Sequence, residues 1–114
     1  MSSMSDSKDK SLRSEREKLL GELSGLYGLI HGSYFERYST CSRPGCACHR
    51  GKKHGPRAYV SIRREGKPRQ HYVLKGQVDA VRNGIEQYHR MLQIADRITE
   101  INLELMRGGR LDEP

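Results

Sequence analysis

The feature that most constrains the fold of this chain is a group of cysteines and histidines within CSRPGCACHRGKKHGP, residues 41–56. Cys41, Cys46 and Cys48 lie within eight residues, and His49 and His54 follow closely. Three thiolates with one imidazole are a common ligand set for structural zinc. We therefore expect one Zn²⁺ held by the three cysteines and one of the two histidines. Reduced cysteines that merely pack, and a redox or nucleophilic role, are the alternatives.

The composition explains why such a chain would need a metal ion. It has 114 residues, of which 34% are hydrophobic and 6% aromatic, so its hydrophobic core must be thin. Small domains compensate with metals, disulfides or oligomerisation. We expect a single zinc-stabilised domain over residues 11–109, between a disordered, serine-rich tail at 1–10 and a short tail at 110–114.

Positive charge is concentrated in the middle of the chain. Residues 41–75 contain ten Lys or Arg against Glu65 alone, and such a block attracts polyanions. A solubilising surface is the alternative, although that usually mixes both signs of charge. The candidate nucleic-acid-binding residues are Arg43, Arg50, Lys52, Lys53, Arg57, Tyr59, Arg63, Arg64, Lys67, Arg69 and His71.

Periodicity predicts an α+β fold, with a helix, the Cys/His loop, a β-hairpin and a second, longer helix. The first helix should begin at Ser14, which forms a capping box with Glu17, and run to about Ile30. Three glycines share another face of this helix and suggest close packing of a second backbone, or simply a weak helix. They are Gly21, Gly25 and Gly28.

Alternating residues at 57–63 and 68–74, separated by the polar turn REGK, predict the hairpin. We expect Arg57, Tyr59, Arg63, Arg69 and His71 to share its exposed face.

The C-terminal helix should extend from about Gln77 to Arg107, where two glycines end it. It has two apolar series with helical spacing, and the second is displaced by about one residue from the first. The first contains Val78, Val81, Ile85, Tyr88, Leu92 and Ala95, and the second contains Met91, Ile94, Ile98, Ile101 and Leu105. Residues 76–107 are thus predicted to pair with the first helix and with a second copy of the chain, as in a coiled coil.

The segment from Gly32 to Leu74 resembles a small uncharacterised prokaryotic family with a Cys-x4-Cys-x-Cys…His-Gly-Pro motif, often encoded near transposases or in mobile elements. The resemblance implies that His54, rather than His49, is the fourth ligand. After His-Gly-Pro the family usually shows consecutive aromatic residues, whereas this chain has Arg57, Ala58 and Tyr59. The matching residues include Gly32, Ser33, Glu36, Arg37, Tyr38, Cys41, Pro44, Cys46, Cys48, Gly51, Lys53, His54, Gly55, Pro56, Tyr59, Val60, Ser61, Gly66, Lys67, Tyr72 and Val73.

These observations favour a basic nucleic-acid-binding protein, an accessory factor of a mobile element, with DNA preferred over RNA. The alternative is an interaction module whose long helix docks a transposase or another protein. An enzyme is not expected, because Glu65 is the only carboxylate near the cluster and the motifs of zinc deaminases and phosphate-binding loops are absent. No segment has the apolar length of a membrane span, so we expect a cytoplasmic protein without a membrane partner.

Overall fold

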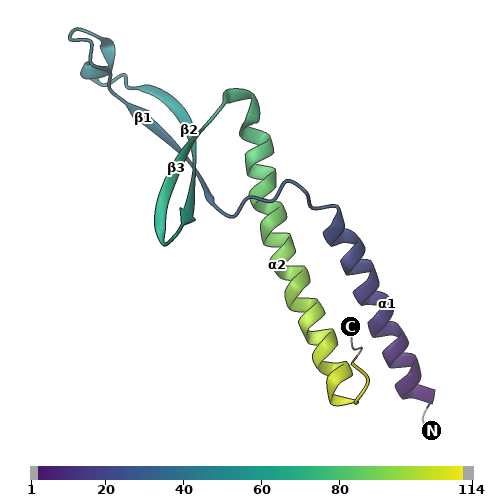
Figure 1. Ribbon diagram of the computed structural model, residues 1–114. Helices are drawn as coiled ribbons and strands as arrows, with labels where there is room; N and C mark the ends of the chain where they lie inside the picture. Colours follow the sequence, from purple (N-terminus) through teal and green to yellow (C-terminus); the bar gives the residue numbers. More distant parts are fainter. Residues whose placement is uncertain (1–2, 112–114) are drawn as a thin grey trace. The chain divides into compact units, whose positions relative to one another are not determined.

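The computed structural model describes residues 3–111, and it confirms the α+β class (Figure 1). The elements in chain order are α1 (Ser3–Ser24), β1 (Ser33–Ser39), the 3-10 helix η1 (Ala47–Arg50), β2 (His54–Arg64), β3 (Lys67–Val73), the 3-10 turn η2 (Lys75–Gln77) and α2 (Val78–Arg107). The contacts divide the chain into two compact units, and the single zinc-stabilised domain over 11–109 stays a prediction. We call residues 28–86 the sheet unit, and the described parts of 1–27 and 87–114 the helical unit.

In the helical unit, α1 runs antiparallel to the C-terminal part of α2, and ion pairs repeat along the pair every seven residues. Glu15 accepts hydrogen bonds from Arg97 at 2.6 and 2.8 Å, and Glu22 pairs with Arg90 in the same way. In both pairs the arginine lowers the pKa of the carboxyl group, chiefly through the side-chain hydrogen bond. A step of seven in one helix matches a step of seven in the other, so successive ion pairs form in the same register of the two helices.

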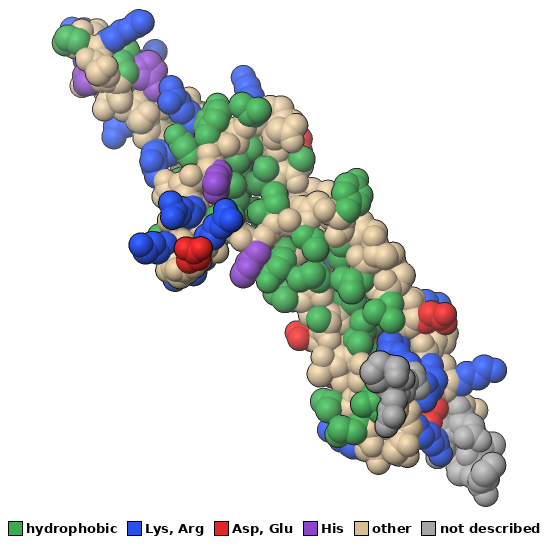
Figure 2. Space-filling view, viewed as in Figure 1, with side chains coloured by type: hydrophobic (Ala, Val, Ile, Leu, Met, Phe, Trp, Pro, Cys, Tyr) green, Lys and Arg blue, Asp and Glu red, His purple; other side chains and the backbone are tan. Residues whose placement is uncertain are grey.

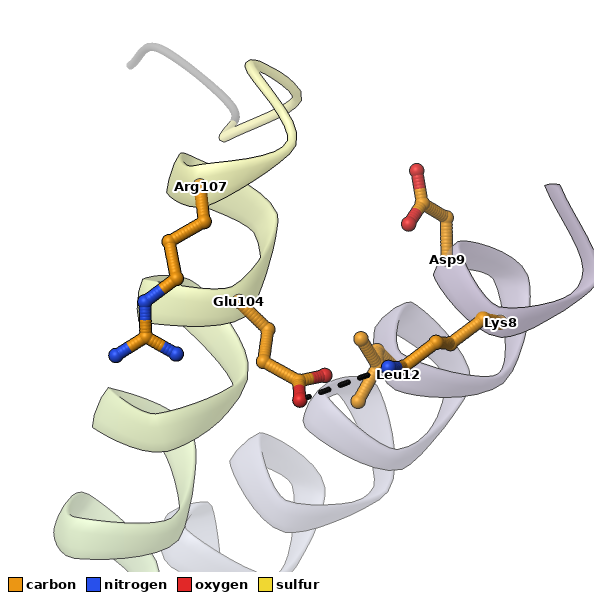
Figure 3. A pocket seen from close by; sticks show the side chains of 5 residues that line it. All are labelled: Lys8, Asp9, Leu12, Glu104 and Arg107. Atoms are coloured by element: carbon orange, nitrogen blue, oxygen red, sulfur yellow. Dashed lines mark ion pairs between the residues drawn. The ribbon is translucent and has the colours of Figure 1, made fainter. Parts of the chain in front are cut away.

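The same series ends at an ion pair between Lys8 and Glu104. Their charged atoms are 3.7 Å apart, and Figure 3 shows the two side chains pointing toward one another beside Leu12. Asp9 extends the contact by accepting a hydrogen bond of 2.7 Å from Arg110. The contacts between α1 and the C-terminal end of the chain therefore include residues of α1 that precede Ser14.

The limits of α1 differ from the prediction. The helix begins at Ser3, so that residues 3–10, expected to be disordered, form its first turns; Ser14 and Glu17 lie inside the helix rather than at its cap. It ends at Ser24 rather than Ile30, and the amide of Gly25 bonds the carbonyl of Glu22. The expected tails at residues 1–2 and 112–114 lie outside the described residues.

A close backbone approach does involve one of the three glycines, Gly28, which lies after α1 rather than within it, and its partner is Gly84 in α2. A side chain at Gly21 would meet nothing within 4 Å, whereas a Cβ at Gly84 would collide with the carbonyl oxygen of Gly28. The amide of Ile30 also donates to the carbonyl of Gly84 at 3.1 Å. The glycine contact thus joins the segment after α1 to the start of α2, within the sheet unit.

The sheet unit contains a three-stranded antiparallel sheet in the order β1-β2-β3. The predicted hairpin is present: Arg64 pairs with Lys67 across a two-residue turn in which Glu65 and Gly66 both have positive φ, as the type I′ turn requires. Strand β1 was not predicted, and it pairs with the other side of β2.

One face of this sheet forms the core of the unit. The buried side chains of Ala58, Val60 and Val73 lie on it. Partly buried apolar residues from the segment before β1, from the strands and from the first turns of α2 pack against them. They are Ile30, Tyr34, Ile62, Val78, Val81 and Ile85.

The displaced apolar series of α2 now have separate explanations. Val78, Val81 and Ile85, from the first series, pack on the sheet. Ile94 and Ile101, from the second series, are fully buried in the helical unit. The displacement occurs near the boundary between the two units, because each part of the helix has its own packing partner. None of the described helices is apolar enough over sufficient length to cross a membrane.

This packing predicts a large effect of truncating the core of the helical unit. Ile101 has no exposed surface, so Ile101→Ala should lower the free energy of unfolding by about 2–4 kcal/mol, through lost burial and the cavity left behind. Leu20 is 49% exposed, so Leu20→Ala should change the free energy of unfolding by about 0.5 kcal/mol. Urea unfolding followed by helical circular dichroism measures both. Equal effects of the two changes would contradict the packing.

Candidate metal centre and basic sheet face

The cysteines and histidines lie in the loop that joins β1 to β2. We call residues 40–53 the Cys/His loop; Figure 1 shows it at one end of the strand pair. At its base Ser39 pairs with His54, which is the first residue of β2. Cys41 follows β1 by two residues, so strand pairing alone places Cys41 near His54.

Local turns bring the remaining cysteines back to this base. The carbonyl of Arg43 accepts a hydrogen bond from the amide of Cys46 at 3.3 Å, closing a turn with Pro44 and Gly45 at its centre. Gly45 has φ of 92°, a value that glycine adopts without strain and that follows proline in type II turns. Cys46 then occupies the N-cap position of η1, and Cys48 lies within that short helix.

The structure brings the ligand atoms of Cys41, Cys46, Cys48 and His54 within 4.8 Å of one another. The sulfur atoms of Cys41 and Cys48 are 3.5 Å apart, and the sulfur of Cys46 lies 3.2 Å from Nε2 of His54. A tetrahedral ion with metal–sulfur distances of about 2.3 Å and metal–nitrogen distances of about 2.0 Å separates its ligands by roughly 3.3–3.8 Å. These four residues could therefore hold a metal ion with small adjustments of their side chains.

The surroundings shift the pKa values of two of the thiols in opposite directions. Hydrogen bonds lower the pKa of Cys46 to about 7. The largest contribution comes from the backbone of Cys48, smaller ones come from the side chains of Cys48 and Cys41, and the smallest comes from His54. Burial raises the pKa of Cys48, which is 2% exposed. The amide of Cys41 also donates to the sulfur of Cys48 at 3.2 Å, a bond that favours the thiolate form that metals bind.

The two candidate histidines have different positions. His49 lies on η1, is exposed, and is not part of the described ligand group. The group contains His54, as the family resemblance implies. The next residue, Gly55, has φ of 126°, and a Cβ there would lie 2.8 Å from the carbonyl oxygen of Arg37. Glycine at this position allows β1 and β2 to approach beside the ligands.

The predicted basic residues surround this centre and continue along the sheet. Arg43 and Arg57 line a hollow together with Cys41, Cys46 and His54. The Cys/His loop also contains Arg50, Lys52 and Lys53, all exposed. Farther along, a second hollow at the hairpin end is lined by Arg64, Glu65, Arg69 and His71, and Lys67 pairs with Arg64 beside it.

The strand register corrects one part of the prediction. Opposite residues in an antiparallel pair point to the same face of the sheet. Arg69 faces Ile62 and His71 faces Val60, so both lie on the core side and not with Tyr59. The residue opposite Tyr59 is Tyr72. The prediction was wrong because alternation defines two faces of each strand, but not which face of β3 continues which face of β2.

The face opposite the core, which we call the open face, includes residues that the sequence analysis did not select. The register places Phe35 beside Tyr59, and Arg37 beside Arg57. The rings of Phe35 and Tyr59 are stacked with centroids 5.4 Å apart, and those of Tyr59 and Tyr72 meet edge to face at 5.9 Å. The aromatic sequence YFERY at 34–38, bounded by Gly32 and Thr40, is the signal that could have identified β1.

The fold and the ligand group define a class: an α+β protein with a small antiparallel sheet and a loop-borne Cys₃His group that could hold a metal ion. A family model described as a domain of unknown function, DUF6788, matches residues 9–83, and the chain belongs to this family. The match spans most of α1, the whole sheet and the beginning of α2. Neither the curated proteins nor the solved structures include a match to the chain. The family description contains nothing that points to catalysis.

The ligand geometry predicts one bound metal ion per chain. Cys48→Ser should abolish most metal binding, because Cys48 is the buried ligand and contacts both the amide and the sulfur of Cys41. His54→Gln should weaken metal binding, whereas His49→Gln should leave it unchanged. Elemental analysis after native purification gives both the identity and the amount of the metal. Protein purified without metal, and insensitive to a strong chelator, would exclude the site.

Proposed function

We propose that this protein binds nucleic acid through a basic sheet unit whose Cys/His loop is held by one structural zinc ion. Zinc fits three thiolates and an imidazole better than the oxygen-preferring cations do. The loop contains one buried side chain among its described residues, that of Cys48. Metal ligation would therefore contribute most of its folding free energy.

The observation that supports nucleic-acid binding is the separation of charge between the two units. The sheet unit contains twelve Lys or Arg against four Asp or Glu, whereas the rest of the chain contains nine against ten. Figure 2 shows Lys and Arg side chains gathered over the Cys/His loop and the strands. In the helical unit several of the arginines are already paired with carboxylates, as Arg90 and Arg97 are.

The same charges indicate how the polyanion would be bound. Arg43, Arg50, Lys52 and Lys53 are exposed on the loop that zinc would make rigid, so phosphates would be neutralised without ordering a flexible segment. Cations that contact phosphates release counterions and give affinity without sequence preference. The cations lie on strands and on a loop with one turn of 3-10 helix rather than along an α-helix, which favours binding of the backbone over reading of the major groove.

Three further expectations accompany this function. A role as accessory factor of a mobile element rests on the family resemblance alone. DNA is expected in preference to RNA. Reduced, metal-bound cysteines and a nucleic-acid partner both suit the cytoplasm.

The proposed function predicts a strong salt dependence. If about six cations contact duplex phosphates, the logarithm of affinity should fall with the logarithm of salt concentration with a slope near −5. Replacing Arg43, Lys52 and Lys53 with glutamine should make the slope shallower by about 2–3. Fluorescence anisotropy with labelled DNA and RNA at several salt concentrations measures both quantities.

A matched control removes charge from the helical unit. Lys18 and Arg107 are exposed there, so Lys18→Gln with Arg107→Gln should leave affinity and slope unchanged. An affinity that does not respond to salt would exclude the proposed function, and equal losses in the loop and control variants would exclude this placement of the site.

A second candidate function, docking of a protein partner through the long helix, is supported by the exposed side of α2. Leu92, Leu103 and Met106 are 44%, 40% and 52% exposed. At about 3.6 residues per turn these positions share one side of the helix, opposite Ile94 and Ile101. The partner would be a second copy of the chain, a transposase or another mobile-element protein.

Self-association through this stripe is directly measurable. Sedimentation velocity should show a dimer that becomes a monomer with Leu92→Lys and Leu103→Lys, since charges would replace exposed leucines while the buried stripe is retained. Charge reversal at Arg57, Arg63 and Arg69 should leave the dimer intact, because these residues lie in the sheet unit. A wild-type monomer at high concentration would exclude the homodimer.

A further inference from the structure

The open face of the sheet contains one aromatic ring from each strand, in a continuous row. Phe35 on β1 faces Tyr59 on β2, and Tyr59 faces Tyr72 on β3. The ring centroids are 5.4 and 5.9 Å apart. We call these three residues the aromatic row.

The row is not part of the core. The core of the sheet unit lies on the other face, where Ala58, Val60 and Val73 are buried. Tyr72 is 57% exposed, and Phe35 and Tyr59 are half-buried. Cross-strand aromatic pairs stabilise a sheet, but that role does not by itself explain the charges around this row.

Every charged strand residue that the register places on the open face is an arginine. Arg37 lies beside Arg57, and alternation along β2 adds Arg63. The guanidinium carbon of Arg37 lies 5.5 Å from the ring centroid of Phe35 and 5.1 Å from that of Tyr59. The carboxylate of Glu36 falls on the other face, opposite Ala58. The open face therefore combines flat π surfaces with positive charge.

Arg37 is also held in place at this face. It donates a hydrogen bond of 2.9 Å to the side-chain oxygen of Gln70, which lies on β3 next to Tyr72 in the register of the open face. A guanidinium fixed above aromatic rings can stack on a base and also neutralise a phosphate. Planar groups from all three strands are thus presented on one surface.

We propose that the aromatic row and Arg37 bind the unpaired bases of single-stranded nucleic acid. The inference rests on the proposed function and names the form of the ligand. Bases in a duplex are stacked on one another, so their faces are not available, whereas an unpaired base can stack on the exposed ring of Tyr72 or on the guanidinium of Arg37, which Phe35 and Tyr59 support from below. Arg57 and Arg63 neutralise the phosphates, and the exposed cations of the Cys/His loop lie in the loop that follows β1.

The test uses the full-length, metal-loaded protein with labelled oligo(dT), oligo(U) and a duplex of equal length. The variant with Tyr59→Leu and Tyr72→Leu should bind both single strands about tenfold more weakly, and the duplex within about twofold of wild type. Its salt slope should be unchanged, because no phosphate contact is removed. The variant with Tyr59→Phe and Tyr72→Phe keeps the rings and should retain wild-type affinity.

Two further variants guard against an effect on folding. Tyr27 is 93% exposed and lies in the helical unit, so Tyr27→Leu should have no effect on binding. Tyr72→Trp keeps a ring in the row and supplies a fluorophore in a chain without tryptophan, so single strands should quench its emission and the duplex should not. Circular dichroism verifies that each variant is folded.

The outcomes separate this inference from the proposed function. Salt-dependent binding that persists unchanged in the leucine variant overturns the single-strand site and leaves nucleic-acid binding intact. Unquenched indole emission from the Tyr72→Trp variant in a bound complex has the same consequence. No binding of any of the three ligands by the wild-type protein overturns both. A preference for oligo(dT) or for oligo(U) tells which nucleic acid the face accepts.

Discussion

The pairing of β1 with β2 is the interaction on which both the Cys₃His group and the aromatic row depend. Its register places Phe35 beside Tyr59 and Arg37 beside Arg57 on the open face. The same ladder ends at the pair of Ser39 with His54, which closes the Cys/His loop. One set of backbone hydrogen bonds therefore aligns the aromatic surface and brings the first and last ligands of the Cys₃His group together.

The sheet has few apolar contacts with which to hold this arrangement. Its buried core consists of Ala58, Val60 and Val73, and the loop contributes the buried side chain of Cys48. Burying a single valine contributes about 1.5–3 kcal/mol, which is small against the backbone entropy lost when the whole Cys/His loop is ordered. A metal ion at the base of the loop would supply the missing free energy at the end of the sheet where the core gives none.

The parts that could be predicted from the sequence are those that local patterns determine. The three cysteines are close in sequence, and the local turn at Pro44 and Gly45 brings Cys46 back toward Cys41. The choice of His54 over His49, in contrast, came from the family resemblance and depends on the pairing of Ser39 with His54. The hairpin followed from alternation and a turn with glycine. The Cys/His loop, the hairpin and the long helix were therefore identified correctly.

The parts that could not be predicted depend on distant partners. α1 extends well before Ser14, and Lys8 there pairs with Glu104 on α2, a contact that the sequence pattern of either helix alone does not reveal. β1 has little alternation, with half-buried Tyr34 and Phe35 in succession, so a pattern of period two could not identify it. Tyr72 belongs with Tyr59 only through the pairing of β2 with β3.

The two-residue turn at Glu65 and Gly66 determines the composition of both sheet surfaces. If one residue were inserted there while the two-residue turn was kept, the pairing would shift by one position and β3 would present its other face. His71 would then stand next to Tyr59, and Val73 would leave the core for solvent. Such a shift would give two faces that each mix apolar and polar residues, so the length of this turn affects more of the sheet than any single side chain does.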